Sequence, residues 1–371
     1  MSLNFELTNY WLPLLWVLIA GTLIGVLPRR EEYIFGWTFI RWRRVPAVFL
    51  VLPLIMWAGS RANFGDTFVY RMGFRNMPET YTGIQSYMSG VGKDKAFYLM
   101  ECVLKCTFGN NYKITFTVLA AIQLLCFVSV VRKYSCDYWF SIFVFIASTD
   151  YYSWMFNGVR QFTAVTIIFV GTTLYLTGKN LLSVLLIIFA SQFHQSALLM
   201  LPVIFIIRGK AWNKKTILLI LGSVVALIYI NQFTSVLDTL LADTQYTNVV
   251  SDWQAWKDDG TNPIRVLVYA APTLLSIAGL RRIREIDDSV INLSVNAGIV
   301  STALGIISIG TSGVFMGRLP IYASLWSTCI LLPWELEYCF SLQLGRMIRI
   351  VTIICYMAFY YVQCHFTWGL L

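Results

Sequence analysis

Apolar runs alternate with polar gaps from one end of the chain to the other. Most of the runs reach the roughly 20 residues that a helix needs to cross a hydrocarbon core. They lie near residues 9–27, 45–60, 112–131, 138–156, 159–177, 181–207, 216–233, 263–280, 289–309, 319–334 and 347–364. This pattern predicts an all-α, polytopic integral membrane bundle of about 10–12 spans. We expect a single transmembrane domain over residues 1–371.

Two long polar insertions, residues 61–111 and 234–262, interrupt this pattern. In the first, AFYLMECVLK (residues 96–105) has apolar positions at helical spacing. This spacing predicts an amphipathic helix along the membrane surface, with Glu101 on its wet face. The second insertion carries five aspartates together with Trp253 and Trp256. Tryptophan beside carboxylates is typical of a sugar-binding surface, but loops at membrane edges also collect tryptophan.

The composition agrees with a membrane protein: 57% of residues are hydrophobic, 13% are charged, and the mean hydropathy is +0.65. The net charge of +9 comes mostly from arginine and lysine in the short gaps between apolar runs. Positive residues in short loops mark the cytoplasmic side, so the charge reports topology rather than nucleic-acid binding. The two insertions are then expected on the outer side. The eight cysteines show no metal or redox spacing.

The run NLLSVLLIIFASQFHQSALLMLPVIFIIRGKAWNKK (residues 180–215) conflicts with this topology if it forms one span. A single span would place its basic end, residues 208–215, on the outer side. A broken or re-entrant hairpin near His194 removes the conflict, because residues 181–193 form a helix of only about 20 Å. Irregular backbone at that depth must line a cavity, so His194 would face one. The alternative is one long tilted helix that contains His194 as a satisfied polar residue.

Three arginines stand at the expected outer ends of apolar runs. Arg61 follows the second run, Arg160 opens the fifth and Arg318 precedes the tenth. A charge at such a depth is costly, and a guanidinium beside a helix N-terminus suits a phosphate or pyrophosphate. Each arginine alone is explained as an interface anchor that reaches water. Together, beside small and polar residues and one internal histidine, they favour a shared anion site.

Polar neighbours extend this candidate site. Asn157 and Gln161 flank Arg160, and Asp66 and Tyr70 follow Arg61. Asp66 would orient an arginine or accept a proton from a substrate hydroxyl, or it would simply cap a helix that begins at residue 67. Tyr322 lies four residues past Arg318 on the same helical face, where it would contact the same ligand or belong to an aromatic belt.

Residues 156–205 resemble the signature block of the EpsG-type membrane proteins, which are Wzy-like polymerases of bacterial exopolysaccharide and O-antigen. SRANFGDTFVY (residues 60–70) and GRLPIYASLW (residues 317–326) are similar to the early and late elements of that family. The positions that fit the central block are Arg160, Gln161, Ala164, Lys179, Ala190, Phe193, His194, Ser196, Ala197, Leu201 and Pro202. One departure concerns Asp94, which is followed by Lys95 and Ala96 where the family pattern has Pro and Gly. The role of Asp94 is therefore open.

The resemblance implies a GT-C-like glycosyltransferase in the bacterial cytoplasmic (inner) membrane, with its active site facing the periplasm or cell exterior. Such a polymerase transfers a growing glycan from undecaprenyl pyrophosphate to a lipid-linked repeat unit. It would work beside membrane lipid, a flippase and a chain-length regulator, without nucleic acid. The expected catalytic residues are His194, Asp66, Arg160 and Arg318, and the expected pyrophosphate- or glycan-binding residues are Arg61, Gln161, Asn157, Tyr70 and Tyr322.

No metal or cofactor is expected, because fixed arginine charge can stabilise a departing pyrophosphate. Direct attack by the acceptor hydroxyl would invert the anomeric centre. Two other functions stay open. A transporter or flippase of lipid-linked oligosaccharide would also use broken helices, although such proteins usually show two related halves. A membrane acyltransferase would need a reactive group served from the cytoplasmic side.

Overall fold

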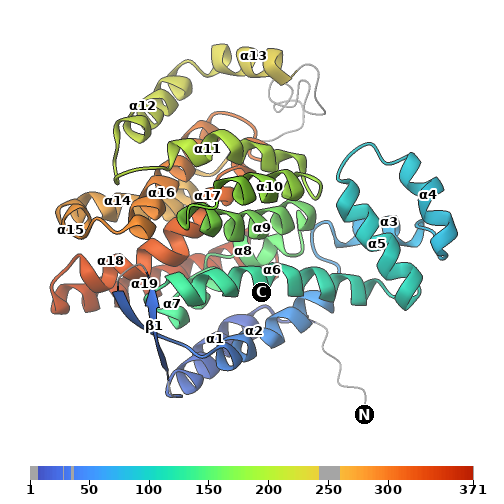
Figure 1. Cartoon of the computed structure of the whole chain (residues 1–371), viewed down its shortest axis with the longest axis horizontal. Coiled ribbons are helices and arrows are strands. Elements are labelled where there is room, and N and C mark those ends of the chain that lie inside the picture. Colours follow the sequence, from blue (N-terminus) through green and yellow to red (C-terminus); the bar gives the residue numbers. More distant parts are fainter. Residues whose placement is uncertain (1–6, 28, 35–36, 242–259, 371) are drawn as a thin grey trace. The chain divides into compact units, whose positions relative to one another are not determined.

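The computed structural model describes residues 7–27, 29–34, 37–241 and 260–370 of the chain. The regular structure of this part is almost entirely helical, as the apolar pattern predicts (Figure 1). The exception is one antiparallel pair of strands, β1 (Arg30–Ile34) and β2 (Trp37–Arg41), in which Arg30 pairs with Arg41. These strands lie in a short basic gap that the apolar pattern left without structure. The protein is an all-α polytopic membrane protein.

The chain divides into two compact units, one formed by Met1–Met200 with Met347–Leu371 and the other by Leu201–Arg346. A single transmembrane domain over residues 1–371 stays a prediction. The first unit contains β1 and β2 and the following helices: α1 (Trp11–Ile24), α2 (Arg44–Gly59), α3 (Thr67–Arg75), α4 (Tyr81–Ser89), α5 (Lys95–Phe108), α6 (Tyr112–Tyr134), α7 (Tyr138–Ala147), α8 (Asp150–Trp154), α9 (Val159–Leu176), α10 (Asn180–Ser191), η1 (Gln195–Leu199), most of α19 (Leu342–Val362) and η5 (Gln363–Thr367).

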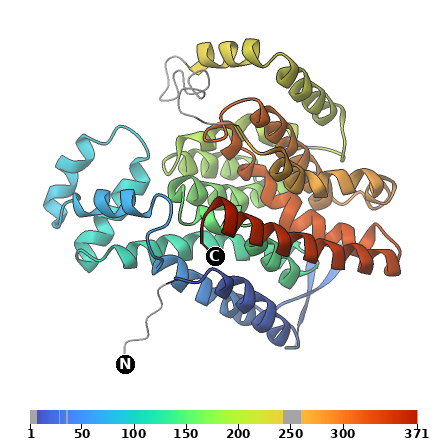
Figure 2. The ribbon, with the colours of Figure 1, turned by 180° about the vertical axis from the view of Figure 1, so that it is seen from behind.

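Close packing along α6 organises the first unit. α6 packs against both α2 and α9. Gly59 permits the contact with α2, because a Cβ atom at this position would lie 1.9 Å from Oγ1 of Thr117. Deeper in the unit, the ring of Phe127 lies 4.2 Å from Phe145 of α7 and 6.0 Å from Phe169 of α9, between ring centroids. Figures 1 and 2 show α3, α4 and α5 grouped beside the start of α6.

The second unit is built around α16 (Ser289–Ile309), most of which is buried. It also contains α11 (Met200–Ile206), α12 (Lys214–Ile228), α13 (Ile230–Leu241), α14 (Pro263–Ala278), α15 (Leu280–Ile286), η3 (Met316–Arg318), α17 (Ile321–Trp326), η4 (Ser327–Leu331) and α18 (Leu332–Tyr338). The amide of Asn296 on α16 donates to the carbonyls of Ile207, Gly209 and Lys210 at 3.1–3.2 Å. A buried polar residue of α16 thereby fixes the loop after α11.

Four of the described helices are long and apolar enough to cross a membrane: α6, α9, α16, and α19 together with η5. The number rises to six if each bent pair is one span; α12 and α13 are bent by 104°, and α14 and α15 by 71°. Five more apolar helices have 10–17 residues, so each is shorter than the roughly 20 residues of a full crossing. The apolar runs are therefore interrupted more often than their composition suggested, and a count of 10–12 spans stays a prediction.

The break near His194 is confirmed. α10 ends at Ser191, η1 begins at Gln195, and His194 stands between them with extended backbone (φ −157°, ψ 120°). One continuous helix through this segment is therefore wrong. Of the outer insertions, residues 61–111 form α3, α4 and α5. In the second insertion, Trp253, Trp256 and four of the five aspartates lie outside the described residues.

Candidate functional site

A tight turn between α8 and α9 positions the candidate site. Gly158 has φ +81°, a left-handed conformation that glycine adopts without strain. Its N–H donates to Oδ2 of Asp66 at 3.2 Å, and the Asn157 amide nitrogen, once oriented toward this carboxylate, lies 3.0 and 3.2 Å from its two oxygens. Gly65 also has positive φ and approaches Asn157 so closely that a Cβ atom would lie 2.9 Å from the Asn157 Cβ. Asp66 and Asn157 therefore join the start of α3 to the start of α9.

The same contacts exclude a helix-capping role for Asp66, while its role toward an arginine or a substrate hydroxyl stays a prediction. α3 begins at Thr67, so Asp66 does occupy the position before the first helical residue, but its side chain makes no capping hydrogen bond there. The carboxylate instead binds the turn ahead of α9.

The first turn of α9 is also held from α6. The Gln123 amide is completely buried and donates to the carbonyl of Val159 at 3.1 Å and to the hydroxyl of Thr163 at 2.9 Å. If the amide of Gln123 moved, the carbonyl of Val159 and the hydroxyl of Thr163 would lose a buried hydrogen bond, which is energetically costly. Gln123 therefore fixes the position of the first turn of α9, which includes Arg160, the residue after Val159.

Arg160 is the centre of the cluster. Its Nη1 donates to Oδ2 of Asp94 at 2.7 Å and to the phenol of Tyr98 at 3.3 Å. The Asp94 side chain is 4% exposed, whereas that of Arg160 is 26% exposed. The Tyr70 ring centroid lies 6.0 Å from the guanidinium carbon. Nε of Arg160 is buried and has no hydrogen-bond partner among the described residues. With 26% of its surface exposed, part of the Arg160 side chain is open to a ligand.

A second carboxyl lies on the same face of α5. Glu101 is 2% exposed, and the expected position on the wet face is wrong. Burial raises the pKa of Glu101 to about 8, even though the Arg160 charge opposes this shift. Burial also raises the pKa of Asp94 above its usual value, again against Arg160. At neutral pH Glu101 is therefore mostly protonated, and Asp94 is the carboxyl group that pairs with Arg160.

The broken segment after α10 meets this cluster. The Ala96 N–H, at the start of α5, donates to the carbonyl of Gln192 at 3.0 Å. The backbone of Gln195 forms a hydrogen bond that lowers the pKa of Asp94 and partly offsets the effect of burial. His194 lies between these two contacts, is half-buried, and has its Nδ1 2.7 Å from Oγ of Ser196. The structure thus brings the His194 segment to Asp94 and Arg160, which are far away in sequence.

Arg61 lies close to the cluster but is enclosed. It is 4% exposed, and its guanidinium donates to the carbonyl of Ala58 at 2.7 Å and to the hydroxyl of Thr67 at 2.9 Å. The Phe116 ring centroid is 4.0 Å from its guanidinium carbon. These are the contacts of an anchor between the end of α2 and the start of α3. Direct contact between Arg61 and a ligand stays a prediction.

The remaining predicted residues are placed as follows. Gln161 is buried on α9 at 4% exposure. Arg318 ends η3 and is half-buried, and Tyr322 on α17 is 3% exposed. Both belong to the second unit, and their participation in the site stays a prediction.

The model of the EpsG family matches residues 44–367. The chain belongs to the EpsG family. No curated protein and no solved structure matches it. Membership of the EpsG family indicates a membrane polysaccharide polymerase of the glycosyltransferase type, with a lipid-linked oligosaccharide as its substrate. The matched range includes every residue of the Arg160 cluster.

Three members of the cluster in this EpsG-family chain were missed or left open by sequence reasoning. Asp94, Tyr98 and Glu101 follow one another at steps of four and three residues, which places them on one helical face. This polar spacing was present in the sequence, but apolar residues between them suggested a surface helix with the opposite orientation. Among the described residues, no group of three histidine, cysteine or acidic side chains is placed to hold a metal ion.

Proposed function

We propose that this EpsG-family protein polymerises a glycan by transferring the growing chain from undecaprenyl pyrophosphate to a hydroxyl of an undecaprenyl-pyrophosphate-linked repeat unit. The observation that carries the proposal is the half-enclosed guanidinium of Arg160. Asp94 and Tyr98 restrain one of its nitrogens, and 26% of the Arg160 side chain stays exposed. A fixed planar donor at the end of a membrane helix suits the oxygens of a diphosphate.

The reaction follows from these parts. The acceptor hydroxyl oxygen attacks the anomeric carbon of the donor sugar, and the bond from that carbon to the diphosphate oxygen breaks. The lipid diphosphate leaves with the bonding electrons, and Arg160 stabilises its developing charge, a role that we propose for Arg318 as well. The acceptor proton passes to a base, for which His194 and Asp66 are the candidates. A single displacement of this kind inverts the anomeric centre and needs no nucleotide, because the donor bond is already activated.

The proposed site faces the outer side of the bacterial cytoplasmic membrane. Support comes from the charge pattern: the arginines and lysines concentrate in the other set of gaps, which the positive-inside rule assigns to the cytoplasm. The Arg160 cluster lies at the opposite end of α2 from Arg43 and Arg44 and next to the insertion 61–111. Tyr70, Asn157, Gln161 and Tyr322 would then contact the diphosphate or the first sugars.

The replacement Arg160→Lys tests the proposal. Lysine keeps the charge but loses the planar fork, so we expect elongation to fall by at least about 100-fold. The measurement is the ladder of products formed by purified protein from a defined lipid-linked repeat unit. Arg75→Lys is the matched control, since Arg75 is exposed and, among the described residues, its side chain hydrogen-bonds only the sulfur of Met72, at 4.0 Å. A normal ladder from Arg160→Lys, in protein that elutes and melts like the parent, would contradict the diphosphate assignment.

A transporter or flippase of the same lipid-linked oligosaccharide is the second candidate. The bends of 104° and 71° in two helix pairs favour it, because transporters build binding sites at such breaks. The same assay separates the two functions. A ladder of longer products requires glycosyl transfer, whereas bound or translocated substrate of unchanged length would indicate transport.

A further inference from the structure

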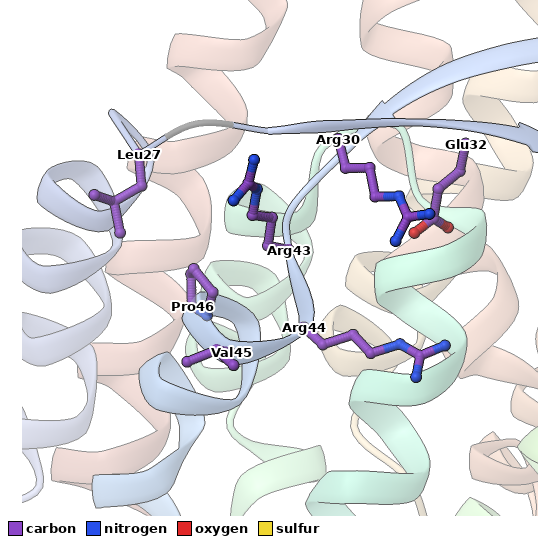
Figure 3. Close-up of a pocket in the computed structure, with 7 residues that line it drawn as sticks. All are labelled: Leu27, Arg30, Glu32, Arg43, Arg44, Val45 and Pro46. Carbon is purple, nitrogen blue, oxygen red and sulfur yellow. The ribbon is translucent and has the colours of Figure 1, made fainter.

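A second basic site lies at the other end of α2. A pocket of about 880 Å³ opens between β1 and the first turn of α2 (Figure 3). Three arginines and one glutamate line it together with apolar side chains: Arg30, Glu32, Arg43, Arg44, Leu27, Val45 and Pro46. In Figure 3, Arg30 and Glu32 reach into this space from β1, and Arg43 reaches up toward the strand from the residue before α2.

The strand wall of this pocket is fixed by contacts with α6. Arg132 donates from Nη1 to Oε1 of Glu32 at 2.9 Å and to the carbonyl of Trp42 at 3.1 Å. The buried Arg41 donates to the carbonyl of Ser135 just beyond α6. β1 and β2 are thereby tied to the end of α6, so the pocket has a defined wall rather than a loose loop.

The pocket carries uncompensated positive charge. Its only carboxylate, Glu32, is already paired with Arg132, and this hydrogen bond lowers the pKa of Glu32. Arg43 and Arg44 are exposed, and their side chains form no ion pair or hydrogen bond with any described residue. An anion in the pocket would therefore contact two arginines that form no ion pair with any described residue.

The backbone at the start of α2 adds N–H donors that also favour an anion. Arg43 precedes α2 with extended backbone and provides no side-chain cap. The first N–H to bond back into the turn is that of Ala47, to the carbonyl of Arg43 at 3.2 Å. The N–H groups of Arg44 and Val45 precede it and have no intrahelical acceptor. They stand at the positive end of the helix dipole, beside the two arginine side chains.

Apolar side chains border this charge on the open side. Val45, in the first turn of α2, is 80% exposed, and Leu27, three residues past the end of α1, is 49% exposed. Exposed aliphatic groups directly beside arginines match a ligand with a phosphate at one end and a hydrocarbon chain at the other. A free phosphate would use the arginines and leave Leu27 and Val45 without a partner.

We propose that this pocket binds the phosphate of an anionic glycerophospholipid, with Arg43 and Arg44 as the main contacts and an acyl chain over Leu27 and Val45. Arg30 adds charge from the strand wall. Basic pockets at the cytoplasmic ends of membrane helices bind anionic lipid headgroups by the same combination of charge and apolar surface. The site is separate from the Arg160 cluster, since the two lie at opposite ends of α2.

The test measures lipid binding to the whole purified protein in dodecyl maltoside. Native mass spectrometry follows the titration with palmitoyl-oleoyl phosphatidylglycerol or with phosphatidylcholine of the same chains. We expect the parent protein to prefer phosphatidylglycerol, and Arg43→Gln with Arg44→Gln to weaken this binding by about tenfold or more. The matched control, Arg281→Gln with Arg284→Gln, removes two exposed arginines from α15 and should bind like the parent.

Each of the following titration results would overturn the proposal: equal affinity for the two lipids, unchanged binding in the Arg43/Arg44 double variant, or an equal loss in the control. A further arm distinguishes the lipid from a free anion. If glycerol 3-phosphate displaces the lipid at equal concentration, the pocket recognises phosphate alone and the lipid assignment fails. Val45→Asp, which keeps both arginines, should also weaken phosphatidylglycerol binding, and full binding by this variant would contradict the acyl contact.

Discussion

Arg160 keeps its orientation because its neighbours leave it little freedom. Asp94 holds one nitrogen at 2.7 Å, Tyr98 contacts the same nitrogen, and Gly158 sets the backbone two residues earlier. A flexible arginine would lose conformational entropy on binding a diphosphate. Arg160 is already ordered by its neighbours, so much of this entropy is lost on folding rather than on binding. Asp94 is nearly buried, so it restrains Arg160 from the protein interior and leaves the exposed part of the Arg160 side chain to the ligand.

At the residue scale, Glu101 gives a prediction for pH. Its pKa in the folded protein is about 8, above the usual value of 4.5, so the folded state holds an extra proton between these two values. Stability contributed by this proton is complete below about pH 4.5 and is lost as the pH rises toward 8. The loss is at most roughly 1.4 kcal/mol per pH unit. Glu101→Gln should flatten the fall of the melting temperature between pH 5 and about pH 8. An identical slope in parent and variant would show that Glu101 does not carry this titration.

His194 gives a second prediction at this scale. If His194 takes the acceptor proton, His194→Ala should slow elongation by roughly 100-fold to 10,000-fold and leave the binding of the lipid-linked substrate intact. The control is His365→Ala, which changes the only other histidine, an exposed residue near the end of the chain. Binding and turnover are measured separately on the same purified variants. An unchanged rate would move the role of base to Asp66 or remove it altogether.

At the element scale, the turn between α8 and α9 makes the site possible. Gly158 has positive φ, and a Cβ atom there would lie 3.0 Å from Cε3 of Trp154. Gly158→Ala should therefore destabilise the protein by about 1–2 kcal/mol and reduce elongation, because the start of α9 must shift. Gly178 is the matched control: it has φ +77° but nothing within 4 Å of an added Cβ. Gly178→Ala should show the backbone strain alone, as a small drop in melting temperature with normal elongation. Equal effects of both changes on elongation would rule out a positioning role for this turn.

The break near His194 and the helix that contains Glu101 show which features could be predicted from local sequence. The break near His194 was predicted because basic residues at 208–215 cannot stand on the outer side, and this constraint acts within one run of the chain. An amphipathic helix over residues 96–105 was predicted from its spacing, but the expected position of Glu101 on its wet face was wrong. An amphipathic pattern defines two faces, and it does not say which face meets the rest of the protein when Glu101 and Lys105 are themselves buried.

For the whole molecule, the proposed orientation in the membrane is directly testable. A protease site inserted at Gly90–Gly92, between α4 and α5, should be cut by external protease once the outer envelope is opened. A site inserted after Asp287, between α15 and α16, should be cut only after the inner membrane is lysed. Both turns carry exposed residues, so the insertions should be tolerated. Cleavage in the reverse order would place the Arg160 cluster on the cytoplasmic side and contradict the proposed site of polymerisation.

The sequence alone determined that this chain is an all-α membrane protein, because the length of each apolar run and the charge of each gap are local properties that do not depend on the rest of the fold. It also pointed to Arg160, Asp66, Tyr70 and His194, since a charge or polar group at the end of a span is costly wherever the rest of the chain lies. Tertiary structure decided which residues these groups meet. Asp94 lies 66 positions from Arg160, and no local pattern fixes such a pair. Only the folded chain brings Asp94, at the start of α5, to Arg160 in the first turn of α9 and to the break after α10, because burial and distance are properties of the folded chain.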